Sequence, residues 1–204
     1  EDLKIGDMLI TRFGPFRAVK WVGKLSFRGE PLVEDRAPVR FAAGSLAANV
    51  PCRDLYVSPE HCMVLDDKLI PAHLLINGIT ITQDLNRQAV YYFHVDLCMH
   101  DCIIADGAWT ESYAEQHNRG SFLNINEFIE MYPDHGFARQ PDCLPRVADR
   151  NEDWARIRDK LLELVPCDRF FDDPDLHLIA DGHRLEPTQT ESYTWMFNVP
   201  GGVA

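Results

Sequence analysis

Reactive side chains gather in two short segments of the chain. The first segment is Tyr56–Cys62, in which Ser58 and His61 lie three residues apart around a Ser-Pro turn. An imidazole exchanges its proton near neutral pH, so it is suited to protonating a nitrogen that leaves a reaction centre. The hydroxyl of Ser58 is placed to bind nearby backbone. We therefore treat Ser58 and His61 as candidate catalytic residues.

The second segment is Tyr92–Cys102, which contains His94, Asp96 and His100. Side chains alternate between the two faces of a strand, so His94 and Asp96 are predicted to share one face. The other face, with the apolar side chains that alternate with them, is predicted to belong to the core: Phe93, Val95 and Leu97. The polar face is then a candidate site.

Other interpretations of the same residues stay open. A single histidine at a strand end is often a hydrogen-bonded structural residue, and His94 with Asp96 also fits a pair that faces solvent. Thiolates and imidazoles are zinc ligands, and four such residues lie in or near the two segments: Cys62, Cys98, His100 and Cys102. Their spacing matches no standard zinc pattern. A cysteine hydrolase is possible from residue types alone, although no feature marks one cysteine as the nucleophile.

The elements that must position these residues are mostly strands. Residues 1–113 are predicted to be all-β, because short apolar runs alternate with turns rich in Gly and Pro. The predicted strands are Met8–Thr11, Val19–Val22, Val39–Ala42, Leu55–Val57, Met63–Leu65, Ile79–Thr82 and Ala89–Leu97. One short helix is predicted over Pro71–Gly78. Many short strands with few helices indicate a sandwich or barrel-like fold.

The pattern becomes helical after Tyr113. A helix is predicted to follow Asn124, which is expected to form a capping box with Glu127. Its expected apolar face contains Ile125, Phe128, Ile129 and Tyr132. Residues 133–150 are rich in proline and polar residues and are predicted to be a linker.

A second helix is predicted over Glu152–Val165. Its apolar stripe is expected to contain Trp154, Ile157, Leu161 and Leu164. Beyond it, Leu176–Leu185 is predicted to be a hairpin around Asp181-Gly182, and Tyr193–Val199 another strand. These strands are too few to close a sheet, so we expect them to dock on the first domain or to be completed beyond Ala204.

Charge is distributed unevenly along the chain. Its 20 Lys and Arg and 32 Asp and Glu residues give a net charge of −12, of which −1 falls on residues 1–100 and −11 on residues 101–204. An acidic chain without a basic stripe is a poor candidate for binding nucleic acid or an anionic membrane. Its longest uncharged run, Leu69–Gln83, is shorter than the ~20 apolar residues of a membrane span.

Taken in order, several segments resemble the bacterial branch of the Hedgehog/intein (Hint) autoprocessing domains. The resemblance covers about residues 1–125. The Ser-Pro-x-His signature within Arg53–His61 is its most specific part. The matching segments are Glu1–Asp7, Val19–Gly23, Arg53–His61, Tyr92–Asp101, Ala105–Gly107, Glu111–Tyr113 and Asn118–Phe122. The residues that follow resemble the carboxyl-side extension of this branch.

The resemblance implies a fold and a reaction. Hint domains fold as a compact all-β horseshoe with pseudo-twofold symmetry. A Cys or Ser at the first position attacks the preceding peptide bond, and the amide becomes a thioester or ester. Carried over residue by residue, Ser58 takes the hydroxyl position and His61 that of the general acid. His94 falls nearest the family's Asp position, with Asp96 close by, and His100 matches an auxiliary histidine.

Two departures from the family pattern shape the expected activity. The nucleophile is expected some residues before Glu1, so the chain as given is expected to be inactive. Inteins end in His-Asn, but the corresponding place here has Glu111-Ser112-Tyr113. We therefore expect cleavage of the upstream peptide bond through an N-to-S or N-to-O acyl shift, without full splicing. The alternative is a degenerate Hint fold that serves as a binding or structural module of a larger bacterial protein.

The remaining expectations concern organisation and partners. We expect a Hint-like domain over residues 1–125, a helical linker region over 126–168 and a small, incomplete β extension over 169–204. The expected substrate is the intramolecular upstream segment, and no cofactor or metal ligands are predicted. Relatives in large exported proteins imply export or surface display, although six cysteines without a disulfide framework do not argue for an oxidising compartment.

Overall fold

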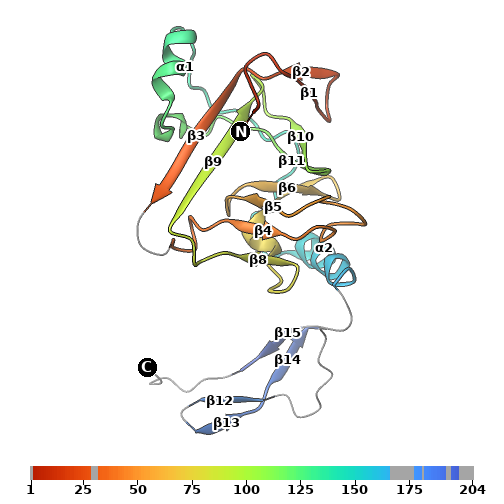
Figure 1. Ribbon diagram of the computed structural model, residues 1–204. Helices are drawn as coiled ribbons and strands as arrows, with labels where there is room; N and C mark the ends of the chain where they lie inside the picture. The colour runs from red at the N-terminus through yellow and green to blue at the C-terminus, as the bar shows by residue number, and fades with distance from the viewer. Residues whose placement is uncertain (1, 29–31, 166–176, 181, 192–193, 198–204) are drawn as a thin grey trace. The chain divides into compact units, whose positions relative to one another are not determined.

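The structure is a computed structural model that describes residues 2–28, 32–165, 177–180, 182–191 and 194–197. Within these residues the protein is mostly β, with small antiparallel sheets and two short α-helices (Figure 1). The mostly-β prediction is therefore confirmed. The chain divides into two compact units, Glu1–Val165 and Pro166–Ala204.

The first unit contains eleven described strands and four helical segments. Its strands are β1 (Met8–Ile10), β2 (Phe16–Ala18), β3 (Trp21–Arg28), β4 (Val39–Phe41), β5 (Leu55–Val57), β6 (Cys62–Leu65), β7 (Lys68–Pro71), β8 (Ile81–Gln83), β9 (Ala89–Asp96), β10 (Cys102–Ala105) and β11 (Ala108–Glu111). Its helical segments are the 3₁₀ turns η1 (Ala72–Leu75) and η2 (Arg119–Ser121) and the α-helices α1 (Ile125–Met131) and α2 (Glu152–Leu162). None of the described helices is long and apolar enough to cross a membrane.

These strands pair antiparallel into four small sheets. The long ribbon of β3 and β9 is conspicuous in Figure 1, and its register places Gly23 opposite His94. A three-stranded sheet has the order β5-β4-β8, and a four-stranded sheet has the order β10-β11-β6-β7. The strands β1 and β2 form a separate hairpin. The predicted short helix after β7 is present as the 3₁₀ turn η1.

The main core joins the two larger sheets to α2. Its side chains come from β4, β6, β7 and the helix, and Phe41, Met63 and Ile70 have no exposed surface. The side chain of Asn151 accepts a hydrogen bond from the amide of Trp154 and so caps the helix (3.0 Å). Three of the four residues of the predicted stripe are buried in this core: Trp154, Ile157 and Leu161. The fourth, Leu164, lies beyond the end of the helix and is 42% exposed, so that part of the prediction was wrong.

A second, aromatic cluster holds α1 against β3. The ring of Trp21 packs edge-on against Phe122 and Phe128, at centroid distances of 5.3 and 5.2 Å. A Cβ on Gly23 would lie 2.8 Å from the Phe122 ring, so the close approach needs glycine there. The expected apolar face is only partly correct, because Phe128 is buried but Ile129 is exposed.

The predicted capping box at the start of α1 was only partly correct: Glu127 does reach back to Asn124 and accepts from its Nδ2 (3.1 Å). The Asn124 side chain forms no cap hydrogen bond to the backbone of the helix. It instead accepts from the amide of Lys24 (2.9 Å) and donates to the carbonyl of Val22 (3.0 Å). Asn124 thus ties the helix to the backbone of β3, a long-range partner that local spacing does not reveal.

The faces of β9 also differ from the sequence expectation. Phe93 was predicted to be in the core, but it is 41% exposed. The buried face instead carries Val90, Tyr92 and Asp96, and His94 is half-buried on it. Leu97, just beyond the strand, is buried as predicted. Within β9 the alternation was correctly predicted, but the choice of the buried face was wrong for Phe93, because polar residues of the other face find partners in the interior.

The segment predicted to be a linker is packed on the first unit. Residues 139–147, here called the strap, form a parallel bridge with β7 at Leu69 and Arg146. The amide of Leu69 donates to Pro145 and the amide of Val147 donates to Leu69, both at 2.9 Å. The strap therefore lies along the edge of the four-stranded sheet. The domain limits predicted at residues 125 and 168 stay predictions.

The second unit is described in two hairpins. The pairs are β12 (Leu178–Ala180) with β13 (His183–Leu185), and β14 (Thr188–Glu191) with β15 (Thr194–Met196). The first hairpin agrees with the predicted strands, and Gly182 in its turn has a φ of 76°. Asp181, Leu176 and parts of the predicted strand Tyr193–Val199 lie outside the described residues.

Candidate functional site

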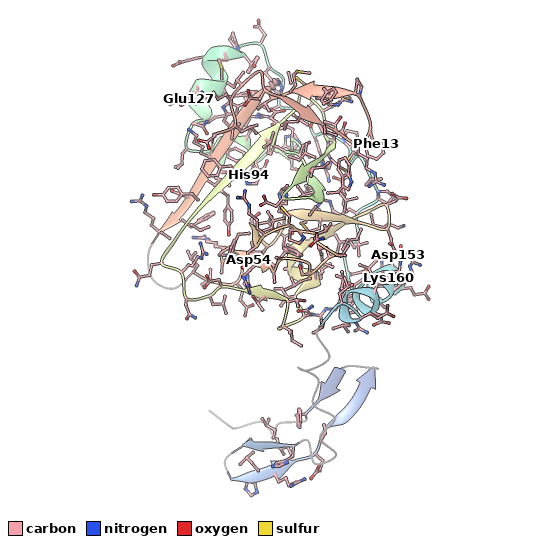
Figure 2. The ribbon with its side chains drawn as sticks, turned by 45° about the vertical axis from the view of Figure 1, so that its right-hand side comes forward. Phe13, Asp54, His94, Glu127, Asp153 and Lys160 are labelled. Atoms are coloured by element: carbon pink, nitrogen blue, oxygen red, sulfur yellow. The ribbon has the colours of Figure 1, made fainter. Side chains whose placement is uncertain are left out.

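A polar cleft in the first unit brings three of the five candidate residues together. It has a volume of about 340 Å³, and its wall includes Ser58, His61, His94, Glu111 and Arg146. A second groove, of about 360 Å³, shares the first four of these residues and continues along exposed aromatic side chains. Figure 2 shows His94 on the long ribbon among the interior side chains of the unit. We call this combined region the candidate cleft.

The turn between β5 and β6 places Ser58 and His61 in the candidate cleft. The carbonyl of Ser58 accepts a hydrogen bond from the amide of His61 (3.0 Å), which closes the turn. The carbonyl of His61 accepts from Ala72, and that of Pro59 accepts from His73, both at 3.0 Å. The 3₁₀ turn η1 therefore buttresses the Ser-Pro-x-His segment from behind.

The hydrogen-bond partners of His61 determine its tautomer. Nε2 of His61 contacts Oγ1 of Thr110, and that hydroxyl donates its one proton to the carbonyl of Cys62 (2.9 Å). Thr110 must therefore accept from His61, so Nε2 carries the hydrogen. Burial lowers the pKa of His61, and Nδ1 is then the nitrogen that can accept a proton.

His94 lies on β9 and is surrounded by aromatic rings. Its ring is 5.1 Å from the Phe122 ring, 6.2 Å from Tyr113 and 6.4 Å from His61, measured between centroids. Burial and the neighbouring His61 lower the pKa of His94 to about 4. Both imidazoles of the candidate cleft are thus uncharged at neutral pH, and either could accept a proton during a reaction.

Glu111 connects the candidate cleft to its surroundings. Its Oε1 accepts from the amide of Cys62 (2.7 Å), and its Oε2 lies 2.8 Å from Nη2 of Arg146 and 3.2 Å from Nε2 of His100. Although burial opposes ionisation, His100, His61 and Arg146 lower the pKa of Glu111 to about 2. This residue is therefore a carboxylate that holds Arg146 at the wall of the cleft.

His100 lies behind the candidate cleft and does not line it. Its side chain is 1% exposed. Nδ1 of His100 lies 3.1 Å from the amide of Cys143, and Nε2 lies 3.2 Å from Oε2 of Glu111. Although burial opposes protonation, hydrogen bonds to Cys143 and Glu111 raise the pKa of His100 to about 9. His100 is therefore placed to orient Glu111 and the strap rather than to touch a substrate.

Asp96 points away from the candidate cleft into a buried ion-pair cluster. Nη1 of Arg119 lies 2.7 Å from Oδ2 of Asp96, and Nε of Arg119 lies 2.7 Å from Oε2 of Glu115. All three side chains are at most 2% exposed. The guanidinium also stacks 4.1 Å from the centroid of Phe128. Asp96 thus anchors η2 and α1 to the end of β9.

Sequence reasoning missed several residues of the cleft, among them Thr110, Glu111 and Arg146. Thr110 lies on β11, opposite Met63 of β6 in the strand register. The alternation of side chains along β11 could have identified it as a candidate residue. Glu111 was noted only as the residue that replaces the terminal element of inteins. Arg146 belongs to the strap and reaches the cleft from far along the chain, so no local pattern indicates its role.

The arrangement is suited to proton transfer in a partly enclosed polar space. It offers two uncharged imidazoles, the Ser58 hydroxyl and a paired carboxylate. In the part of the chain that the structure describes, no group of three or more His, Cys, Asp or Glu side chains could hold a metal ion. The imidazoles and the hydroxyl can give and accept protons, so the residues of the cleft are suited to acid–base chemistry.

Comparison with protein families matches residues 1–117 to the Hint domain family. The match spans more than half of the chain and includes every candidate residue of the sequence analysis. It also includes Thr110 and Glu111. Neither the curated proteins nor the solved structures that were compared include a significant match.

Proposed function

Since the chain belongs to the Hint domain family, which is associated with autoprocessing, we propose that this domain cleaves the peptide bond upstream of it. The observation that carries the proposal is the pairing of His61 and His94 in one cleft. Their rings are 6.4 Å apart and both pKa values are lowered. Two uncharged imidazoles at one point fit a reaction in which a proton leaves a nucleophile and reaches a departing nitrogen.

The reaction begins with a Cys or Ser of the upstream segment. Its sulfur or oxygen forms a bond to the carbonyl carbon of the preceding residue, and the carbon–nitrogen bond breaks. Nδ1 of His61 accepts the proton of the nucleophile and donates it to the departing nitrogen, so the amide becomes a thioester or ester. Water or an added thiol then opens this intermediate and releases the upstream chain.

The other candidate residues receive supporting roles in this proposal. The hydroxyl of Ser58, at the cleft wall, binds the strained peptide group. His94 lies close enough to His61 to assist the proton transfer, and its burial keeps it uncharged. His100 and Asp96 act as positioning residues, because each is held by buried partners outside the cleft.

We propose cleavage without splicing. Splicing needs a terminal Asn that cyclises, and the corresponding place here has Glu111-Ser112-Tyr113, of which Glu111 lies at the cleft. An ionised carboxylate that is bound to Arg146 and His100 cannot undergo that cyclisation. The acyl intermediate is therefore expected to end by hydrolysis or by transfer to an external nucleophile.

The proposal is tested on the polypeptide as its gene encodes it, with the residues that precede Glu1 included. Intact mass is measured over time with and without a small thiol. We expect two fragments whose masses sum to the precursor plus water, or plus the thiol, and faster cleavage when thiol is present. A chain that stays whole under both conditions contradicts self-processing and favours a binding or structural module.

A further inference from the structure

Two thiols lie in contact where the strap crosses the four-stranded sheet. Sγ of Cys102, at the start of β10, is 3.5 Å from Sγ of Cys143 in the strap. Cys102 has no exposed surface, and Cys143 is partly exposed. Apolar side chains surround the pair, including Val64 and Leu69.

We propose that Cys102 and Cys143 form a reversible disulfide that fixes the strap to β10 beside the candidate cleft. A disulfide requires a sulfur–sulfur distance of about 2.0 Å. From 3.5 Å, the two sulfur atoms need to approach by about 1.5 Å. Hydrogen bonds already hold the strap at this place, between the amide of Cys143 and Nδ1 of His100 and from the amide of Leu69 to the carbonyl of Pro145.

The surroundings favour this pair over the other described cysteines. Cys52 and Cys98 are exposed. Cys62 is buried, and its sulfur accepts from Nη1 of Arg146 (2.6 Å). The thiol pair therefore combines a partly exposed sulfur, which a reagent can reach, with a buried sulfur that the reagent cannot reach.

This difference sets the order of the reaction with a small-molecule disulfide. The Cys143 thiolate attacks one sulfur of the reagent, a mixed disulfide forms and a small thiolate leaves. Cys102 then loses its proton and attacks the Cys143 sulfur, and the second small thiolate leaves. The protein thiols are oxidised, the reagent is reduced to two thiols, and the two protons of Cys102 and Cys143 end on those thiols. A hydrogen bond from Cys102 lowers the pKa of Cys143, which supports this order.

The bond would act on the candidate cleft through the neighbours of Cys143. Asp142 binds Arg146 through two contacts, at 3.0 and 2.9 Å, and Arg146 binds Glu111. A covalent link at residue 143 restricts the strap segment that carries both residues. Oxidation is therefore expected to hold the cation of Arg146 on Glu111, at the wall that contains His61.

The first test maps the disulfide in the chain of residues 1–204, without any requirement for self-cleavage. A Cys98→Ser variant is used, because trypsin then yields Cys102 as the one cysteine of residues 88–119 and Cys143 as the one cysteine of residues 140–146. After incubation of the folded protein with oxidised glutathione, we expect these two peptides to be joined and to separate on reduction. A cross-link that forms only in urea, or glutathione adducts on both cysteines without a cross-link, would overturn the proposal.

The second test compares stability in the two redox states. Oxidation is expected to raise the urea midpoint of the wild-type chain, because the bond closes a loop of about 40 residues. The midpoint of Cys143→Ser is expected to be the same with oxidised and reduced glutathione, while Cys52→Ser keeps the wild-type shift. A wild-type urea midpoint that does not change on oxidation contradicts the disulfide proposal. Self-processing is measured separately on the longer polypeptide, so failure of one proposal can be distinguished from failure of the other.

Discussion

The proposed chemistry depends on the protonation of single residues. The Thr110 hydroxyl donates to Cys62 and accepts from His61, so it fixes which imidazole nitrogen is basic. Burial keeps both His61 and His94 uncharged near neutral pH. These two effects make proton acceptance by Nδ1 of His61 possible while neither imidazole is charged in the resting cleft.

Replacement of Thr110 tests this tautomer argument. Thr110→Val keeps the shape of the side chain but leaves Nε2 of His61 without an acceptor. We expect self-cleavage to slow by about tenfold or more, equivalent to about 1.4 kcal/mol in the barrier. The free energy of unfolding should fall by about 1–3 kcal/mol. The measurement is the rate of fragment formation by intact mass.

Thr110→Ser serves as the matched control, since it keeps the hydroxyl. It is expected to retain nearly the wild-type rate. Equal rates for the Val and Ser variants would show that the hydroxyl does not position His61.

His94 is expected to make stability depend on pH. Its pKa is lowered to about 4 in the folded state and is about 6.5 when unfolded, so the unfolded state binds more protons between these values. The free energy of unfolding should therefore fall as pH falls through this window. We expect His94 to contribute about 1.5 kcal/mol of this loss between pH 6.5 and pH 5.

Urea unfolding at several pH values measures this contribution. His94→Asn removes the titrating group, so its stability should fall less steeply than that of the wild type in this window. If the free energy of unfolding falls equally steeply with pH in both proteins, His94 is excluded as the source of the pH dependence.

At the residue scale, part of the site could be predicted from the sequence and part could not. The hydroxyl and imidazole of Ser58 and His61 lie on one turn, so their spacing was informative. The partners of Asp96 and Glu111 come from η2 and the strap, and burial of such charges depends on partners far along the chain. Sequence spacing therefore could not separate the cleft residue His94 from the structural residue Asp96.

At the scale of elements, β9 carries His94 into the cleft, and β3, paired with β9, is braced by α1. Gly23 leaves the space that Phe122 fills, and Phe122 packs against His94. The buried Arg119 joins this brace to β9 through Asp96. Short apolar runs predicted most of these strands, but β2, β7, β10 and β11 were not predicted.

The buried ion pair predicts a large loss of stability on substitution. Arg119→Met leaves the carboxylates of Asp96 and Glu115 buried without their cation. We expect the free energy of unfolding to fall by about 3–5 kcal/mol. Chemical denaturation followed by tryptophan fluorescence measures this change, since Trp21 lies in the same cluster.

Arg156→Met is the matched control, because Arg156 pairs with Asp153 on the exposed side of α2. Its loss is expected to be below about 1 kcal/mol. A cost for Arg119→Met no larger than that of the control would show that the buried cluster does not hold the brace.

At the scale of the whole molecule, the compact unit extends to Val165. The helix α2 contributes Trp154, Ile157 and Leu161 to the main core, and the strap pairs with β7. The family match ends at residue 117. The strap and α2 lie after this limit, and they form an additional part that packs on the Hint domain region. Proline and polar composition indicated a linker here because composition does not report pairing with a distant strand edge.

Two truncations test where the folding unit ends. A chain of residues 1–165 should unfold cooperatively with the urea midpoint of the first unit in the full chain. A chain of residues 1–125 loses three buried core side chains, each worth about 1.5–3 kcal/mol, and should be largely unfolded or aggregated. Equal midpoints for the two truncated chains would place the limit of the domain near residue 125 instead.

The central claim is that His61 carries the proton in self-cleavage. The direct measurement is the cleavage rate of the polypeptide that includes the residues before Glu1, as wild type, His61→Asn and His117→Asn. His117 is exposed and has a φ of 64°, a conformation that Asn tolerates, so it controls for the substitution itself. The account predicts cleavage slowed by about 100-fold or more in His61→Asn and unchanged in His117→Asn. Wild-type cleavage in His61→Asn, with the fold intact, would contradict it.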